Sequence, residues 1–150
     1  MNTYHFTIVV RDAVFDDDLE DKLFNAGLDD ALLCTFDDMV YLEFDRQAID
    51  AKTAISTALD NLRQAGFSDL ILQERGVSSL AEIAKRLNVS RTTLTNYANN
   101  KRGAGNFPKP VYGILSGSAL YAWAEVASWL YKQGKLPQSD YEVAVNANLF

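Results

Sequence analysis

Cysteine and histidine are almost absent from this chain of 150 residues, which has one of each. A single cysteine, Cys34, excludes an internal disulfide and a cluster of thiolate metal ligands. It falls in an apolar run, where we expect a buried small hydrophobe. A single histidine, His5, has no second imidazole with which to share a metal ion. We therefore expect no catalytic residue, no metal and no cofactor, and the sequence gives no basis for an enzyme.

Long apolar runs are also missing, since none approaches the roughly 20 residues that cross a membrane. Residues 1–5 lack the basic and apolar regions of a signal peptide. The hydrophobic fraction of 48% is nevertheless that of a globular protein. From these features we expect a reduced, cytoplasmic protein with no membrane partner.

Charge is unevenly distributed along the chain, although its net value is −6. Residues 1–75 hold 16 acidic and 6 basic side chains, for a net charge of −10, whereas residues 76–150 hold 4 and 8, for a net charge of +4. Such asymmetry indicates two domains with different partners, which we place at residues 1–75 and 76–150. A local basic patch on an acidic protein can still bind phosphate groups.

Apolar periodicity in the first half predicts the order β-α-β-β-α-β. This order resembles the ferredoxin-like split βαβ fold, so we expect an α+β chain with a ferredoxin-like first domain. In the first strand, alternation places Tyr4, Phe6, Ile8 and Val10 in the core. The elements are expected at Tyr4–Val10, Asp16–Ala26 with three aspartates in its first turn, Ala31–Phe36, Met39–Phe44, Ala48–Ala65 and Leu70–Gln73. The second and third strands are expected to form a tight hairpin across Asp37-Asp38.

The opposite face of this sheet is expected to stay open. It mixes His5, Thr7, Val9 and Tyr41, and apolar side chains there would meet water. A second copy of the chain could cover that face, and a homodimer is therefore expected through residues 1–75.

Residues 79–99 have the pattern of a helix-turn-helix. Leu80, Ile83, Ala84 and Leu87 recur at helical spacing, and Ala84 is small enough for a second helix to cross closely. Asn88 tolerates a left-handed turn, Val89 is expected to plug that turn, and Ser90 is a good N-cap for the second helix. Leu94 and Tyr97 then point inward.

The outward side of that second helix is rich in hydrogen-bonding groups, as reading of the DNA major groove requires. Arg91, Thr92, Thr95 and Asn96 should face base edges, because arginine suits guanine and asparagine suits adenine. A further group should hold phosphates, which fix register more than sequence. Its members are Ser90, Asn99, Lys101, Arg102 and Lys109.

The segment that follows the helix-turn-helix is expected to form a wing. Residues 99–106 predict a basic, flexible loop, and two short strands are expected at Val111–Leu115 and Ala119–Trp123, across a Ser-Gly-Ser turn. A helix over Glu125–Lys132 places Trp129 in the core. A last short helix begins near Asp140.

Residues 78–131 resemble a known family, the phage excisionase and AlpA-like regulators, which are related to the MerR-type winged helix. The resemblance is carried by the helix-turn-helix, by the Phe-Pro-Lys-Pro-Val stretch at 107–111 and by the Trp-Ala-Glu-Val-Ala-Ser-Trp run at 123–129. It implies a winged helix-turn-helix whose tryptophan-rich helix packs behind the DNA-reading helices. It says nothing about the first half of the chain.

These observations predict a sequence-specific double-stranded DNA-binding transcriptional regulator of phage or mobile-element type, which represses or activates and controls its own gene. Two alternatives stay open. One is an antitoxin-like protein whose acidic residues 1–75 bind a partner protein. The other is an excisionase-like factor that bends DNA.

Overall fold

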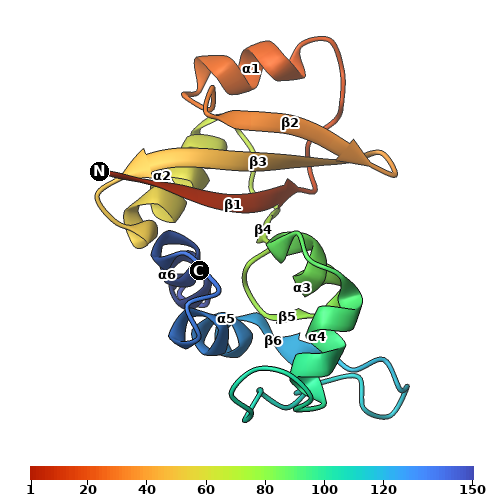
Figure 1. The fold of residues 1–150 in the computed structure, drawn as a ribbon. Coiled ribbons are helices and arrows are strands. Elements are labelled where there is room, and N and C mark those ends of the chain that lie inside the picture. The colour runs from red at the N-terminus through yellow and green to blue at the C-terminus, as the bar shows by residue number, and fades with distance from the viewer. The chain divides into compact units, whose positions relative to one another are not determined.

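The computed structural model describes all 150 residues and divides them into two compact units. The first unit contains Met1–Glu74 and Asn146–Phe150, and the second contains Arg75–Val145. The chain is α+β, with six helices and antiparallel strand pairing (Figure 1). None of the helices combines the length and the apolar content needed to cross a lipid bilayer. The last five residues were expected in the second domain but belong to the first unit.

The first unit is a four-stranded sheet with two helices. Its elements are β1 (Asn2–Val10), α1 (Leu19–Asn25), β2 (Ala31–Phe36), β3 (Met39–Ala48), α2 (Ala51–Gln64) and β4 (Leu70–Leu72), in that order along the chain. The strands lie in the order β2-β3-β1-β4, and every neighbouring pair is antiparallel. Even-numbered side chains are buried from Tyr4 to Val10 in β1, as the alternation predicted, and from Val40 to Ala48 in β3, with Ile8 and Leu42 at the centre.

A tight turn joins β2 to β3. Asp37 and Asp38 both have a positive φ, of 46° and 65°. Two consecutive residues of this kind form the turn that matches the twist of a two-stranded hairpin. The register Phe36↔Met39 and Cys34↔Tyr41 follows directly from that turn. The hairpin expected from the sequence is therefore confirmed.

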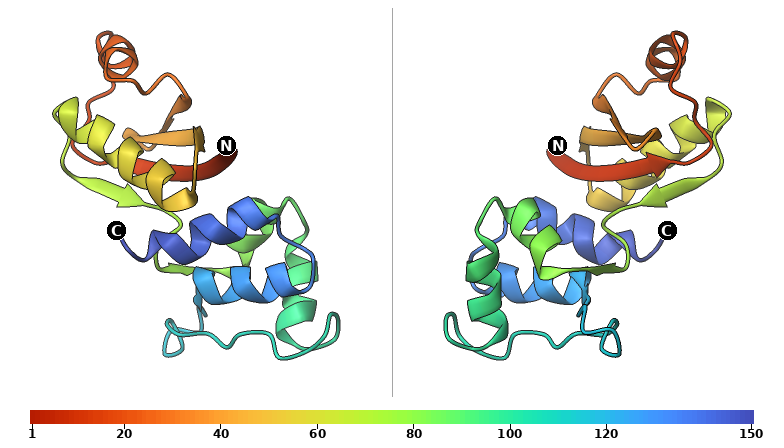
Figure 2. Two further views of the ribbon diagram at one scale, coloured as in Figure 1. Left: turned by 90° about the vertical axis from the view of Figure 1, so that its left-hand side faces the viewer. Right: turned by 90° about the vertical axis from the view of Figure 1, so that its right-hand side faces the viewer.

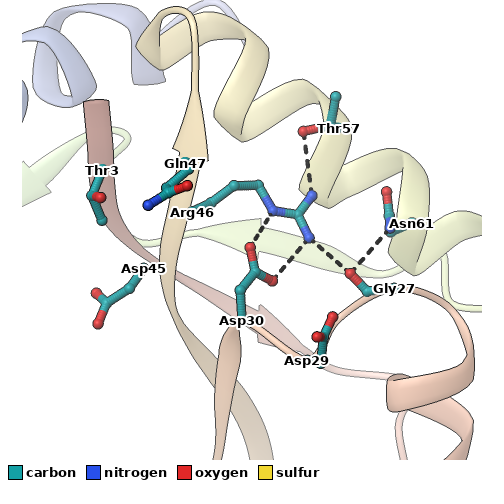
Figure 3. A pocket seen from close by; sticks show the side chains of 9 residues that line it. All are labelled: Thr3, Gly27, Asp29, Asp30, Asp45, Arg46, Gln47, Thr57 and Asn61. Carbon is teal, nitrogen blue, oxygen red and sulfur yellow. Dashed lines mark hydrogen bonds and ion pairs between the residues drawn. The ribbon is translucent and has the colours of Figure 1, made fainter. Parts of the chain in front are cut away.

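A buried arginine of β3 joins the sheet to α2 and to the loop between α1 and β2 (Figure 3). The Arg46 guanidinium donates to both carboxylate oxygens of Asp30, at 2.7 and 3.0 Å, and to the Gly27 carbonyl oxygen at 3.1 Å. It also donates to the Thr57 hydroxyl at 3.3 Å. Only 9% of the Arg46 side chain is exposed. Because these acceptors satisfy most of its donors, Arg46 serves the structure rather than a ligand.

Several expected boundaries in the first unit are wrong. Helix α1 begins at Leu19 rather than Asp16, because the Asp16 carboxylate accepts the Asp18 N–H and fixes a local turn instead. Strand β3 continues to Ala48, and α2 begins only at Ala51, where Asp50 caps it. Cys34 is half-buried rather than buried.

The second unit is mostly helical. It contains β5 (Val77–Ser78), α3 (Leu80–Leu87), α4 (Arg91–Ala98), β6 (Tyr121–Ala122), α5 (Trp123–Lys132) and the start of α6 (Gln138–Ala147). Strands β5 and β6 pair antiparallel. One apolar cluster joins α3, α4 and α5, and Ile83, Leu94, Val126 and Trp129 lie within it.

Strand β5 was not expected, and it changes the wing. Its partner β6 covers only two residues of the predicted strand Ala119–Trp123, since α5 already begins at Trp123. The predicted strand Val111–Leu115 is reduced to one isolated bridge, Tyr112↔Leu120. The two-residue length of β5 explains the miss, because so short a strand has no periodicity to detect.

Candidate nucleic-acid interface

The turn between α3 and α4 is closed by the backbone. Asn88 adopts the left-handed conformation, with φ of 54° and ψ of 46°. The Val89 N–H then donates to the Ala84 carbonyl oxygen at 3.0 Å. The Val89 side chain is 42% exposed, so the expectation that it plugs the turn is wrong. The asparagine conformation and this backbone bond, rather than an apolar side chain, end α3.

Serine residues begin both helices of the pair. The Ser79 hydroxyl accepts the Glu82 N–H at 3.2 Å, and the Ser90 hydroxyl accepts the Thr93 N–H at 3.3 Å. The second cap is the one predicted. Because the Ser90 hydroxyl also contacts the Thr93 hydroxyl at 3.0 Å, its first role is structural. It remains exposed at the N-terminus of α4, where backbone N–H groups favour an anion.

Helix α4 separates an apolar side from a polar side. Leu94 and Tyr97 are buried, as predicted. The four side chains expected to face base edges all lie away from that core: Arg91 and Thr92 are exposed, whereas Thr95 and Asn96 are half-buried. The Thr95 hydroxyl donates to the Arg91 carbonyl oxygen at 3.1 Å, so it can offer an incoming group only its lone pairs and its methyl group.

The loop after α4 is held in place. The Trp129 indole N–H donates to the Gly105 carbonyl oxygen at 2.9 Å, and the Lys101 N–H donates to the Asn96 carbonyl oxygen at 2.9 Å. A Cβ atom on Gly103 would lie 2.8 Å from the Trp129 ring. The indole of α5 thus contacts this loop at Gly103 and Gly105, a contact that the sequence did not predict, and the same loop carries Lys101 and Arg102. Figure 2 shows this segment running past α5.

Exposed basic side chains follow α4 along the chain. The four residues expected to hold phosphates besides Ser90 are all exposed, namely Asn99, Lys101, Arg102 and Lys109. From Ile83 to Ala124 the chain has no aspartate or glutamate. The local field on this segment is therefore positive, despite the net charge of −6.

One basic residue of this group was missed from the sequence. The Lys135 ammonium lies 5.1 Å from the centre of the Tyr97 ring, and the Arg102 guanidinium lies 6.0 Å from the same ring. The tyrosine thus brings together cations from two segments about thirty residues apart, as cation–π contacts allow. Lys135 follows α5 in a turn, and no motif around it could have indicated this position.

The segment expected to form a wing, residues 111–120, is a short loop with an apolar tip. The Leu120 N–H donates to the Tyr112 carbonyl oxygen at 2.8 Å, and the Tyr112 N–H donates to the Leu120 carbonyl oxygen at 3.3 Å. Gly113 has φ of +76°, and a Cβ there would lie 1.9 Å from the Ser118 carbonyl oxygen. Beyond this constriction Ile114 is 63% exposed and Leu115 is fully exposed. Two large apolar side chains are therefore presented to the surroundings from a narrow base.

Comparison with known proteins adds no relative, since the chain matches no protein-family model, no curated protein and no solved structure. No group of three or more histidine, cysteine or acidic side chains could hold a metal ion. A functional assignment therefore depends on the side chains described above.

Proposed function

We propose that the chain is a sequence-specific double-stranded DNA-binding transcriptional regulator. In this proposal Arg75–Val145 is a winged helix-turn-helix domain similar to those of excisionase and AlpA-like regulators. The observation that carries it is the pair α3 and α4, with a left-handed Asn88, a capping Ser90 and a polar outer side beginning at Arg91.

The dimensions of α4 support the proposal. Its eight residues give a length of about 12 Å at 1.5 Å per residue, similar to the width of the major groove. Arg91 is exposed at its N-terminal end, which is the end that contacts base edges in helix-turn-helix proteins. Asn96 lies one turn and a half further along and could pair with adenine.

For the first unit we propose the ferredoxin-like fold. The supporting observations are the strand order β2-β3-β1-β4, with all neighbours antiparallel, and the helices α1 and α2 that follow the first and third strands. One helix-turn-helix module is a small interface for specific binding. We therefore propose a homodimer on a near-palindromic site.

The first test is selection of a preferred duplex from random sequences, followed by measurement of affinity against salt concentration. If about four to six phosphates are neutralised per protomer, log affinity should fall with log salt at a slope of about −4 to −5 for each bound protomer, and about twice as steeply for the dimer. A slope near zero, or no duplex binding at low salt, contradicts the proposal.

Single substitutions then separate base contacts from phosphate contacts. Arg91→Ala and Asn96→Ala should each cost about 1–3 kcal/mol on the selected duplex and little on random DNA. Lys101→Ala should weaken both about equally, because phosphates carry no direct sequence information. Lys52→Ala removes an exposed lysine of the first unit and is the matched control. Equal losses on both duplexes for Arg91→Ala would contradict α4 as the reading helix.

A second candidate function, DNA bending, is favoured by the wing tip. Ile114 and Leu115 are apolar and exposed, and proteins that kink DNA insert such side chains between base steps. Leu115→Ser should then reduce the bend angle measured by fluorescence resonance energy transfer between the ends of the bound duplex, while the selected sequence stays the same. An unbent duplex with the unsubstituted protein excludes this candidate.

A further inference from the structure

Strand β2 is an edge strand whose outer side has no partner in the sheet. It lies at one end of the order β2-β3-β1-β4. In an antiparallel pair, successive residues turn their backbone groups alternately toward the partner and away from it. The Asp45 N–H donates to the Asp30 carbonyl oxygen, so the backbone N–H and C=O groups of even-numbered β2 residues point toward β3. The N–H and C=O groups of Leu33 and Thr35 therefore point to the free edge.

An apolar groove of about 360 Å³ lies between this edge and α1. Phe15, Leu23, Phe24, Leu28, Leu32 and Leu33 supply most of its lining. Two of these side chains are also largely exposed, namely Phe15 at 61% and Phe24 at 64%. The Leu32 side chain points to the opposite face of the sheet, because its cross-strand partner is the exposed Glu43. At about 200 Å² per aromatic side chain, these two phenylalanines leave roughly 250 Å² of apolar surface open beside the groove.

The surroundings of the groove are acidic. Glu20 and Asp29 line the groove itself, and Asp16, Asp17, Asp18 and Asp21 lie close to Glu20 in the sequence. Asp37 and Asp38 follow the other end of β2. Lys22 is the single basic residue between Asp12 and Asp45. Its ammonium lies 4.8 Å from the centre of the Phe67 ring, which does not line the groove.

This charge pattern selects the occupant. Two copies of β2 paired antiparallel would bring Asp29 of one copy beside Asp37 and Asp38 of the other, at both ends of the new pair. Like charges placed across strands are destabilising. A strand with lysine or arginine at its ends would instead meet carboxylates at both ends of β2. Asp30 takes no part in this comparison, because Arg46 already neutralises it.

We propose that the free edge of β2 binds an extended apolar segment of another protein that is flanked by basic residues. The segment adds a strand to the sheet through the backbone groups of Leu33 and Thr35. Its alternate side chains enter the groove beneath α1, since Leu33 faces the same side of the sheet as its buried cross-strand partner Leu42. The site lies wholly within the first unit, and the proposal does not depend on DNA binding.

The probe for this site is a short capped peptide of alternating valine and threonine with two lysines at each end. Its controls are the same peptide with glutamates in place of the lysines and the lysine peptide with a central proline. Binding to the full-length protein is measured by fluorescence anisotropy, and amide hydrogen exchange reports on β2. The lysine peptide should bind, slow the exchange of the Leu33 and Thr35 amides, and bind at least about tenfold more tightly than either control.

Two variants separate backbone pairing from charge. Thr35→Pro removes an N–H that faces away from β3, so the hairpin should persist while peptide affinity falls by about tenfold. Substituting both turn aspartates, Asp37→Asn with Asp38→Asn, keeps residues that tolerate a positive φ and should weaken only the lysine peptide. Asp60→Asn, on an exposed part of α2 outside the groove, is the matched control and should change neither.

Each other result overturns the proposal in a distinct way. Equal affinity for the lysine and glutamate peptides would mean that the carboxylates do not select the occupant and that binding is nonspecific apolar association. Unchanged affinity in Thr35→Pro would mean that no strand is added at this edge. Protection of Leu33 and Thr35 without peptide, together with a concentration-dependent mass in sedimentation, would assign the edge to a second copy of this chain.

Discussion

Gly103 offers a sensitive test of how the loop after α4 is held. Its φ is +83°, and an added Cβ would lie 2.8 Å from Cη2 of Trp129 and 3.3 Å from the Tyr97 ring. Gly105, two residues later, also has a positive φ, of +77°, but an added Cβ there would meet nothing within 4 Å. Alanine should therefore cause a similar backbone strain at both positions, and the two variants should differ only in how the added Cβ packs.

The two costs can be estimated separately. A left-handed backbone costs a residue with a Cβ about 1–2 kcal/mol. Forcing an extra carbon into a packed site costs about 1–3 kcal/mol more. Gly105→Ala should therefore lower the unfolding free energy of the second unit by about 1–2 kcal/mol. Gly103→Ala should lower it by about 2–5 kcal/mol, because the Trp129 ring is buried against other side chains of the cluster and cannot easily move away.

Tryptophan fluorescence during urea unfolding measures this difference, because Trp123 and Trp129 both belong to the second unit. Gly103→Ala should also weaken DNA binding under conditions in which the variant is still folded, since the displaced loop carries Lys101 and Arg102. Equal destabilisation by the two alanine variants would refute the reasoning, since it would mean that the indole does not constrain this loop.

Three further predictions concern single side chains. Ser90→Ala should destabilise the second unit by about 0.5–2 kcal/mol in urea unfolding and weaken DNA binding, because it removes the cap of α4. Gly113→Ala should disorder the wing, seen as faster amide exchange at Tyr112 and Leu120, because the added Cβ cannot coexist with the Ser118 carbonyl oxygen at 1.9 Å. The Ser68 backbone N–H, which Asp12 accepts at 2.9 Å, holds the pKa of that carboxyl below its ordinary value. The stabilisation from Asp12 is thus present above the unfolded-state pKa and is lost as pH falls through the lower folded-state pKa, and Asp12→Asn should flatten the acid limb of stability in that window.

The elements with a clear period were predictable from the sequence. Alternation over Tyr4–Val10 identified the buried side of β1, and the Asp37-Asp38 pair identified the hairpin. The interior of α4 was also correct, with Leu94 and Tyr97 buried. In each case the signal lies within a few neighbouring residues, because period and turn chemistry are local properties.

The features that the sequence missed depend on contacts between distant residues. Strand β5 exists because Val77–Ser78 pairs with Tyr121–Ala122, more than forty residues away. The loop after α4 is hydrogen-bonded to Trp129 through Gly105, and Lys135 reaches Tyr97 from beyond α5. Glycine-rich and basic composition describes such a loop but cannot reveal the indole that holds it.

The two proposed surfaces have opposite charges, so salt should weaken binding at both of them. Salt dependence alone therefore cannot distinguish specific sites from general attraction between charged molecules. Substitutions can, because each surface has its own charged residues. The aspartates at 37 and 38 should affect binding of the basic peptide but not of DNA. Lys101 should affect binding of DNA but not of the peptide. If either substitution changed both affinities equally, the charge of the whole chain would explain both, and neither surface would be a specific site.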